Sequence, residues 1–266
     1  MHYKLAAIDL DDTFIDNSHN FSQRTLEVVK KTIEKGNYII LASGRSYRGL
    51  KAHYDILSLD SPLITCGGTI VTDTDGNTLY SSVVPHASAK KVLEFAEERG
   101  LHSQVYFGDN FVFNKESEFS RLYERFYGFP GVINPDLLSL PDLSTPKVLL
   151  IDTVEKIQAV QKEAEALFPE LSIATSKPYY LEFYNPNASK GKALEFLGEY
   201  LGIKREEIIA IGDSGIDLSM IQYAGLGVAV ENAVPAVKEA ADYITFSNEE
   251  EGVAHILEKF MLEDNP

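Results

Sequence analysis

Short apolar runs alternate with helical patterns in the first part of the chain. Residues 5–8 and 38–42 form apolar runs of the length of buried strands. Between them, Leu26, Val29 and Ile33 recur at the spacing of one helix face. A strand, a helix and a strand over this length predict a βαβ unit, and therefore a parallel sheet with a right-handed crossover.

The helix of this unit carries signals at both ends, and further elements follow it. Ser22 stands at an N-cap position, and Gly36 stands where a C-cap glycine belongs. The elements expected next are a helix at 47–57, a strand at 63–66, and a hairpin of strands 69–72 and 78–82.

From about residue 85 to residue 186, strands outnumber helices. The expected helices lie at 88–99, 116–127 and about 157–167, and the expected strands at 102–107, 111–114, 147–151, 171–175 and 179–184. The last two strands are expected to pair antiparallel. Residues 128–146 are rich in Pro, Gly and Asp, which predicts a loop. This mixture is typical of an α+β module.

The alternation of strands and helices returns after residue 186. Ser189 is expected to cap a helix that Gly202 ends, and further strands are expected at 208–211, 227–230 and 243–246, with a final helix at 250–262. The fold class is therefore α/β with a parallel sheet, interrupted by an inserted α+β domain. We place the discontinuous core domain at 1–84 and 187–266 and the inserted domain at 85–186.

The composition is typical of a globular protein. With 266 residues, 44% hydrophobic and 24% charged, the chain can bury a core in one large domain or two modest ones. Its apolar runs are too short to cross a bilayer, and the N-terminus reaches an acidic turn before a signal peptide could form. We expect a cytoplasmic protein with no membrane partner, whose oligomeric state stays open.

The cysteine and histidine content and the net charge limit the kinds of site and ligand that the chain can have. The single cysteine, Cys66, excludes an internal disulfide, fits a reducing compartment, and is expected to be a small buried hydrophobe. The six histidines include no pair at ligand spacing, which disfavours zinc. A formal net charge of -16 disfavours nucleic-acid binding, because polyanions would be repelled, but permits a small anion held by local cations.

Carboxylates crowd the turn after the first strand. Asp9, Asp11 and Asp12 stand within four residues, and their repulsion costs stability unless a cation or a phosphoryl ligand uses them. Most clusters of charged residues are solvated turns, and taken alone this cluster favours a functional site over a solvated acidic turn only modestly. Motifs elsewhere in the chain distinguish between these two interpretations.

Polar residues also follow two other expected strands. Ser43 comes after 38–42 and Asp213 after 208–211, while Lys190 begins the helix that follows the insert. Because ligands of open parallel sheets bind beyond the carboxyl ends of the strands, we expect these groups to converge with Asp9. Taken singly, Ser43 could be a loop cap and Lys190 a solvated helix residue.

Four segments together resemble the motifs of the haloacid dehalogenase (HAD) superfamily. In chain order they are Asp9-Leu10-Asp11-Asp12-Thr13, Ala42-Ser43-Gly44-Arg45, Ser189-Lys190-Gly191 and Gly212-Asp213-Ser214-Gly215-Ile216-Asp217. The insert between the second and third resembles the C2-type cap of the Cof-like subfamily IIB, and residues 227–233 and 242–245 resemble that subfamily's C-terminal segments. The resemblance covers the two core segments well and the cap in outline, and it implies a Rossmann-like HAD core with an inserted cap.

The resemblance also implies a role for each motif. Asp9 would be the nucleophile that forms an aspartyl phosphate, and Asp11 the general acid and then the general base. Lys190 would neutralise the charge that the phosphate shares with Asp9. The groups implied to bind the substrate phosphate are Ser43, the amide of Gly44, Arg45 and Lys190.

A magnesium ion is implied at the same place. The carboxylates of Asp9 and Asp213 and the backbone carbonyl of Asp11 would bind Mg²⁺, with water completing an octahedron. Asp217 is expected to hold Lys190 or its own loop, and Thr13 to stabilise the turn by hydrogen bonding to the backbone.

Three residues depart from the family pattern. Asp12 stands where a glycine is commonest, Ile216 stands where an asparagine usually precedes the last aspartate, and Cys66 stands where asparagine often precedes glycine. The last two remove polar groups near the expected pocket, but the nucleophile, the acid, Lys190 and Asp213 are unaffected.

The function implied is that of a Mg²⁺-dependent phosphatase, a phosphoric monoester hydrolase that acts on small phosphorylated metabolites. Sugar phosphates are the leading class, and the cap would close over the core through hinges near Pro85 and Asn185-Pro186. One alternative is a phosphomutase that uses the same phosphoaspartate. Another is a catalytically eroded, non-enzymatic binding protein. A dehalogenase fits less well, because that reaction has no leaving alkoxide for Asp11 to protonate.

Overall fold

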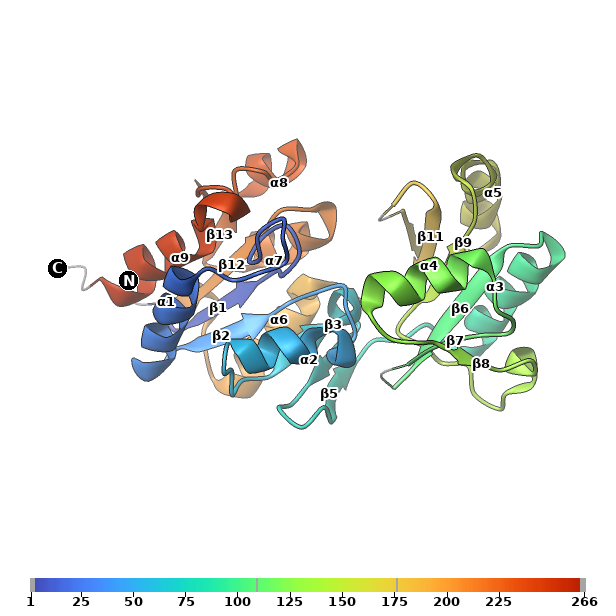
Figure 1. Cartoon of the computed structure of the whole chain (residues 1–266), viewed down its shortest axis with the longest axis horizontal. Helices are drawn as coiled ribbons and strands as arrows, with labels where there is room; N and C mark the ends of the chain where they lie inside the picture. Colours follow the sequence, from blue (N-terminus) through green and yellow to red (C-terminus); the bar gives the residue numbers. More distant parts are fainter. Residues whose placement is uncertain (1–2, 109, 176, 264–266) are drawn as a thin grey trace. The chain divides into compact units, whose positions relative to one another are not determined.

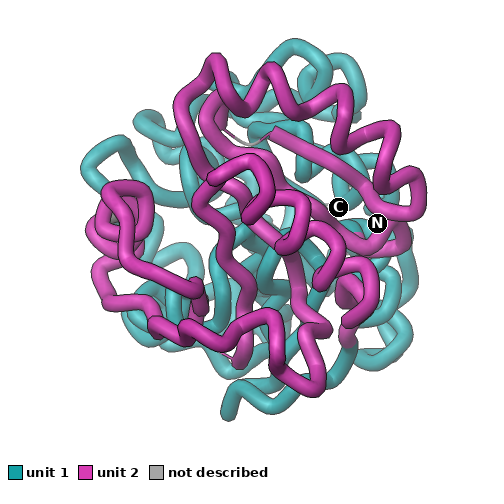
Figure 2. Tube along the Cα trace, turned by 90° about the vertical axis from the view of Figure 1, so that its right-hand side faces the viewer, with its two compact units in different colours: residues 1–80, 189–266 teal, residues 81–188 magenta. Residues whose placement is uncertain are grey.

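The computed structural model describes residues 3–108, 110–175 and 177–263, which fall into two compact units. Unit 1 comprises residues 1–80 and 189–266, and unit 2 comprises residues 81–188 (Figure 2). The predicted limits at 84/85 and 186/187 lie within a few residues of these divisions. That the two units act as a core domain and a cap domain stays a prediction.

Unit 1 is organised around a parallel sheet with the strand order β14-β13-β12-β1-β2 (Figure 1). Its strands are β1 (Leu5–Ile8), β2 (Tyr38–Leu41), β12 (Ile208–Gly212), β13 (Leu226–Ala229) and β14 (Tyr243–Ile244). In β1, Ala7 pairs with Ile40 of β2 on one side and with Ala210 of β12 on the other. The predicted parallel sheet is confirmed. Strands β1 and β12 are buried throughout, which explains their continuous apolar runs.

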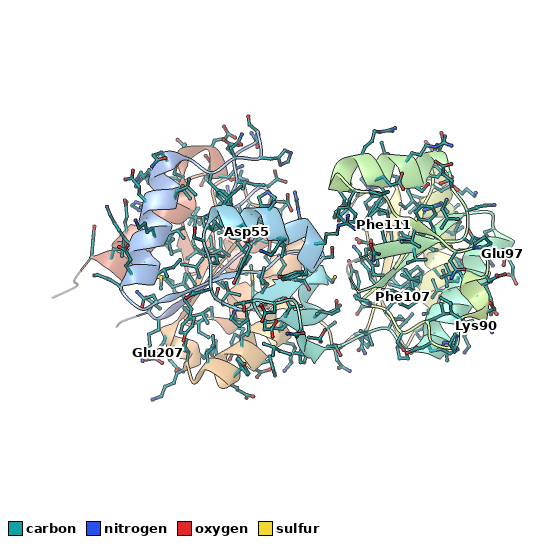
Figure 3. The ribbon with its side chains drawn as sticks, turned by 60° about the horizontal axis from the view of Figure 1, so that its bottom comes forward. Asp55, Lys90, Glu97, Phe107, Phe111 and Glu207 are labelled. Carbon is teal, nitrogen blue, oxygen red and sulfur yellow. The ribbon has the colours of Figure 1, made fainter. Side chains whose placement is uncertain are left out.

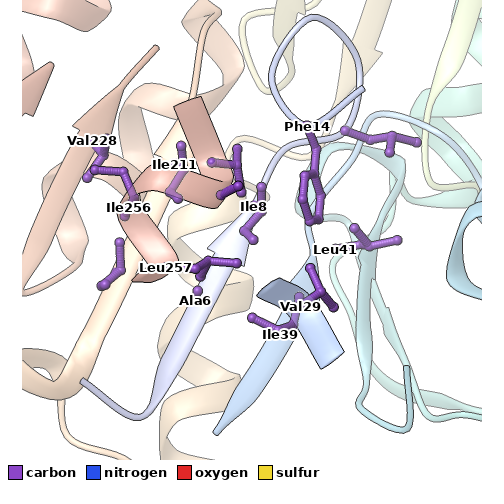
Figure 4. Packing of buried hydrophobic residues seen from close by; sticks show 14 of the residues in the cluster. Ala6, Ile8, Phe14, Val29, Ile39, Leu41, Ile211, Val228, Ile256 and Leu257 are labelled. Carbon is purple, nitrogen blue, oxygen red and sulfur yellow. The ribbon is translucent and has the colours of Figure 1, made fainter. Parts of the chain in front are cut away.

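Helices cover both faces of this sheet. They are α1 (Gln23–Glu34), α2 (Tyr47–Ile56), α6 (Lys190–Leu201), α7 (Leu218–Tyr223), α8 (Pro235–Ala240) and α9 (Gly252–Leu257). Alternate residues of β1 point to opposite faces: Ile8 packs with residues of α1 and α9 (Figure 4), whereas Leu5 packs with residues of α6 and α7. The sheet is therefore packed against helices on both faces, which fixes the positions of the strand ends at its carboxyl edge.

A small antiparallel sheet lies beside the main one in unit 1. It consists of β3 (Leu63–Thr65), β4 (Ile70–Thr72) and β5 (Thr78–Ser81), and a bridge between Ala42 and Ile64 links it to the end of β2. The strand predicted at 63–66 ends one residue early. Cys66 adopts a left-handed φ of 51° and opens a 3₁₀ turn, Cys66–Gly68, which a strand pattern does not reveal.

Unit 2 is a mixed sheet with helices on both faces. The strand order is β10-β11-β9-β6-β7-β8, with bounds Ser172–Ala174, Tyr180–Tyr184, Val148–Ile151, His102–Phe107, Asn110–Phe113 and Val132–Ile133. Helices α3 (His86–Glu98) and α5 (Val154–Leu167) pack on one face, and α4 (Glu118–Tyr127) adds Tyr123 to an aromatic cluster with Phe111 on the other. Phe111 lies in this sheet and Glu97 on the outer side of α3 (Figure 3). The predicted α+β module and its antiparallel pair, β10 and β11, are confirmed.

The prediction of a plain loop over 128–146 was wrong in part. Val132–Ile133 form the edge strand β8, which pairs parallel with β7, and Leu137–Ser139 form a 3₁₀ turn. A strand of this length has no alternating pattern, so only its long-range pairing defines it. Among the described residues, the longest and most apolar helices still fall short of what crossing a bilayer requires.

Candidate active site

The acidic turn begins where β1 ends, and its first carboxylate is buried. The backbone N–H of Asp9 donates to the Ile211 carbonyl at 2.9 Å, which continues the pairing of β1 with β12. The side chain of Asp9 therefore emerges at the carboxyl edge of the sheet, in a residue that is only 5% exposed. This is the edge at which parallel sheets bind ligands.

Lys190, the first residue of α6, points its ammonium at this carboxylate. Its Nζ donates to Asp9 Oδ1 at 2.6 Å and also to Asp217 Oδ1, and the residue is 0% exposed. Burial alone would lower the pKa of Lys190, but Asp217 and Asp9 hold it above its usual value. Lys190 is therefore a fixed buried cation, and the interpretation of a solvated helix residue is wrong.

The start of α6 is fixed by a cap and by a close approach. Ser189 Oγ accepts a hydrogen bond from the Lys192 N–H at 3.1 Å, as expected of an N-cap. Gly68, with φ of +93°, lies so close that a Cβ there would stand 2.2 Å from the Ser189 carbonyl carbon. The 3₁₀ turn after β3 thus packs directly on Ser189. Only glycine at position 68 permits an approach this close.

Asp217 orients both Lys190 and the loop after β12. Its Oδ2 accepts from the backbone N–H of Asp213 at 3.2 Å and from the N–H and hydroxyl of Ser214 at 3.0 and 2.9 Å. Its other oxygen accepts from Lys190. Sequence reasoning expected this holding role for Asp217 but missed Ser214, because a serine in a loop carries no signal of its own.

Asp213 lies beyond the end of β12 and faces the same point. Thr13 Oγ1 donates to Asp213 Oδ1 at 3.1 Å, so Thr13 links the acidic turn to this loop, whereas the sequence predicted a bond to the backbone of its own turn. Burial raises the pKa of Asp213 to about 7, and the charge of Asp217 adds to the rise. Burial likewise raises the pKa of Asp9 well above its usual range, against the effect of Lys190.

These carboxylates fit a divalent cation. Oxygens of Asp9, Asp213 and Asp217 lie within 4.8 Å of one another, and the Lys190 ammonium contacts two of these carboxylates, Asp9 and Asp217. Because Asp217 already accepts at both oxygens, Asp9 and Asp213 are the better ligands among them. Carboxylate oxygens are the donors that Mg²⁺ prefers, and a cation would offset the burial and the mutual repulsion that together raise the pKa values of Asp9 and Asp213.

The residues after β2 form a tight turn. Ser43 is buried, its N–H donates to the Ile64 carbonyl at 2.9 Å, and its Oγ accepts from the Arg45 N–H at 3.2 Å. The Ser43 hydroxyl thus caps the loop, which is one of the two roles that the sequence allowed for it. Ser43 also follows β2, the strand next to β1. A Cβ on Gly44 would lie 3.9 Å from Ile216 Cδ1. Ile216, which stands where the family usually has an asparagine, therefore lies beside this turn.

Arg45 contacts Asp11. Its Nε donates to Asp11 Oδ2 at 2.9 Å and its Nη2 to Asp11 Oδ1, which makes a two-pronged ion pair. The sequence suggested a phosphate contact for Arg45, and that role stays a prediction.

The backbone around Asp12 explains one departure from the family pattern. Asp12 has a φ of 61°, in the left-handed region where glycine is favoured and aspartate is tolerated. Asn232 Nδ2 donates to the Asp12 carbonyl at 2.7 Å and holds the turn. Asn232 was missed as a supporting residue, although it lies in a segment, 227–233, that the resemblance singled out.

Comparisons with known proteins agree with this geometry. A family model described as haloacid dehalogenase-like hydrolase matches residues 6–257. A haloacid dehalogenase-like hydrolase from Bacteroides thetaiotaomicron has a crystal structure that is similar with a TM-score of 0.88 and 32% identity, over 97% of this chain and 99% of that one.

Two further relatives have named activities. The 5-amino-6-(5-phospho-D-ribitylamino)uracil phosphatase YitU of Bacillus subtilis (strain 168) is 28% identical over 96% of this chain and 97% of its own. The structure of the HAD subclass IIB sugar phosphatase BT4131 is similar with a TM-score of 0.82 and 25% identity, over 97% of this chain and 98% of that one.

Proposed function

Because the chain belongs to the haloacid dehalogenase-like hydrolases, we propose that it is a Mg²⁺-dependent phosphatase of small phosphorylated metabolites. The observation that carries the proposal is the buried group of Asp9, Lys190 and Asp217, with Asp213 beside it at the same sheet edge. Sugar phosphates are the leading substrate class, supported by the named activity of BT4131, and YitU supports a phosphorylated ribityl compound as a second class.

The reaction would run in two displacements on Asp9. An oxygen of the Asp9 carboxylate attacks phosphorus, the bond from phosphorus to the substrate oxygen breaks, and Asp11 gives its proton to the leaving alkoxide. Asp11 then takes a proton from water, whose oxygen attacks phosphorus, and the bond to Asp9 breaks to release phosphate. Lys190 keeps Asp9 oriented and offsets charge throughout, while Ser43 and the Gly44 N–H bind phosphoryl oxygens.

A bound Mg²⁺ would supply a positive charge for the transferring phosphoryl group, held by Asp9, Asp213 and the backbone carbonyl of Asp11. The chain's own share of the work is to hold these oxygens in place before substrate arrives. Thr13 does this for Asp213 and Lys190 does it for Asp9.

A phosphate-release screen tests the function. The wild-type protein with Mg²⁺ should release phosphate from p-nitrophenyl phosphate and from members of a panel of sugar phosphates and phosphorylated ribityl compounds. Excess chelator should remove the activity, and added Mg²⁺ should restore it. Conversion of a sugar phosphate to its isomer without net phosphate would instead indicate the phosphomutase, and no turnover on any substrate would contradict both.

Metal binding has an expected signature that needs no turnover. Mg²⁺ at about 100 times its dissociation constant should stabilise the wild-type protein by about 2.7 kcal/mol, which raises the melting temperature by roughly 5 °C. Asp213→Asn should lose most of this shift, because a carboxamide is a weaker ligand than a carboxylate. Asp55→Asn, on the exposed surface of α2, is the matched control and should keep it. An equal shift in Asp213→Asn would place the cation elsewhere.

A further inference from the structure

The guanidinium of Arg45 forms an ion pair with the carboxylate of Asp11. Its guanidinium uses two nitrogens on the two oxygens of one carboxylate, and a third, Nη1, lies 3.5 Å from the Gly49 carbonyl in α2. A planar guanidinium that bonds both oxygens of a carboxylate fixes the orientation of that carboxylate and offsets its charge. The side chain of Arg45 is 15% exposed, so the guanidinium sits in protein rather than in bulk water.

The backbone of Arg45 is anchored on both sides. Its N–H donates to Ser43 Oγ at 3.2 Å, and its carbonyl accepts from the Cys66 N–H at 2.7 Å. The side chain of Asp11 is less buried, with 36% of it exposed, and Asp11 lies in the turn that follows β1. A carboxylate in that setting would sample several rotamers unless a fixed group held it.

We propose that Arg45 is a positioning residue for Asp11, and that it aims the carboxyl group that protonates the leaving oxygen. This inference rests on the proposed phosphatase function. As the bond from phosphorus to the leaving oxygen breaks, the proton passes from one oxygen of Asp11 to that oxygen, while the other oxygen can keep its contact with Arg45. Once ionised, the carboxylate has both oxygens free to accept from Arg45. In the second displacement, one oxygen takes a proton from the attacking water while the other keeps its contact with Arg45.

The inference makes a prediction about leaving groups. In the first displacement, loss of a positioned acid slows substrates whose leaving oxygen needs a proton and spares those whose leaving oxygen does not. Phenyl phosphate and p-nitrophenyl phosphate are close in size but differ in this need, since nitrophenolate leaves readily without protonation. Loss of a phosphate ligand would instead slow both substrates alike and weaken inhibition by inorganic phosphate.

The experiment measures the single-turnover rate of phenol or nitrophenol release, which reports the first displacement alone, in full-length wild type, Arg45→Gln, Arg45→Lys and Asp11→Asn, all with Mg²⁺. Arg45→Gln should lower this rate for phenyl phosphate by about 10-fold or more, with changes below about 3-fold for p-nitrophenyl phosphate and for the inhibition constant of phosphate. Arg45→Lys, which keeps the charge but not the planar guanidinium, should lie between. In an Asp11→Asn background, Arg45→Gln should cost nothing further with phenyl phosphate.

Controls separate this outcome from damage to the fold. Arg24→Gln removes a guanidinium that pairs with two other carboxylates, Glu251 and Glu258, and should leave both rates unchanged. Melting temperatures report whether the Arg45 variants fold. Equal losses on both substrates with weaker phosphate inhibition, or no loss on either, would overturn the inference while wild-type activity upheld the function. Inactive wild type would overturn the proposed function, and the inference with it.

Discussion

Asp9→Asn is expected to lower kcat by about 10⁴-fold or more, the scale of losing a covalent nucleophile. A carboxamide has the same shape but lacks the negative charge that attacks phosphorus. The protein should remain folded, because Lys190 keeps its second carboxylate partner, Asp217, and one of the mutually repelling acids becomes neutral. The measurement is phosphate release on the best substrate of the screen, with circular dichroism to confirm the fold.

The matched control is Asp11→Asn, which removes the proton donor and acceptor but not the nucleophile. With p-nitrophenyl phosphate, this variant should still form the aspartyl phosphate and should hydrolyse it slowly. Acid-quenched protein should therefore carry one PO₃ group on the peptide that contains Asp9, and Asp9→Asn should carry none. Activity of Asp9→Asn within 10-fold of wild type, or a PO₃ group on another residue, would contradict the assignment of the nucleophile.

Much of the core fold could be predicted from local sequence because its strands are buried on both faces. Strands such as β1 and β12 are continuous apolar runs, and polar motifs begin where the runs stop. The carboxyl ends of neighbouring parallel strands meet at one edge, so the convergence of Asp9 and Asp213 followed from topology alone. The role of Lys190 could be predicted only from the family resemblance, since nothing in its spacing distinguishes a buried lysine from a solvated one.

What could not be predicted depends on contacts between residues distant in sequence. The partner of Arg45 is Asp11, and neither residue's neighbours indicate the pairing. The left-handed backbone of Cys66 and the close approach of Gly68 to α6 appear only once that helix is packed in place. Strand β8 is likewise defined by its pairing with β7 and by no pattern of its own. Such features are decided by tertiary packing, which a local pattern does not encode.

Lys190→Met should lower the free energy of unfolding by about 3–5 kcal/mol in the absence of Mg²⁺, as expected when one partner of a buried ion pair is removed. Methionine fills the volume but leaves Asp9 and Asp217 facing each other without a cation, in residues that are 5% and 0% exposed. The activity should fall by about 10²-fold or more, because the charge shared with the phosphoryl group is then unopposed. Urea denaturation and phosphate release measure the two effects.

Lys192→Met is the matched control, since Lys192 lies on the same helix with a side chain 64% exposed and a surface partner, Glu195. Such a surface pair contributes little, so the change in unfolding free energy should stay within about 0.5 kcal/mol. Adding Asp217→Asn to Lys190→Met removes one uncompensated charge and should recover at least about 1 kcal/mol, a coupling expected only between groups in contact. If Lys190→Met proved as stable as Lys192→Met, or if the second substitution recovered nothing, then the buried ammonium would not be what balances these carboxylates.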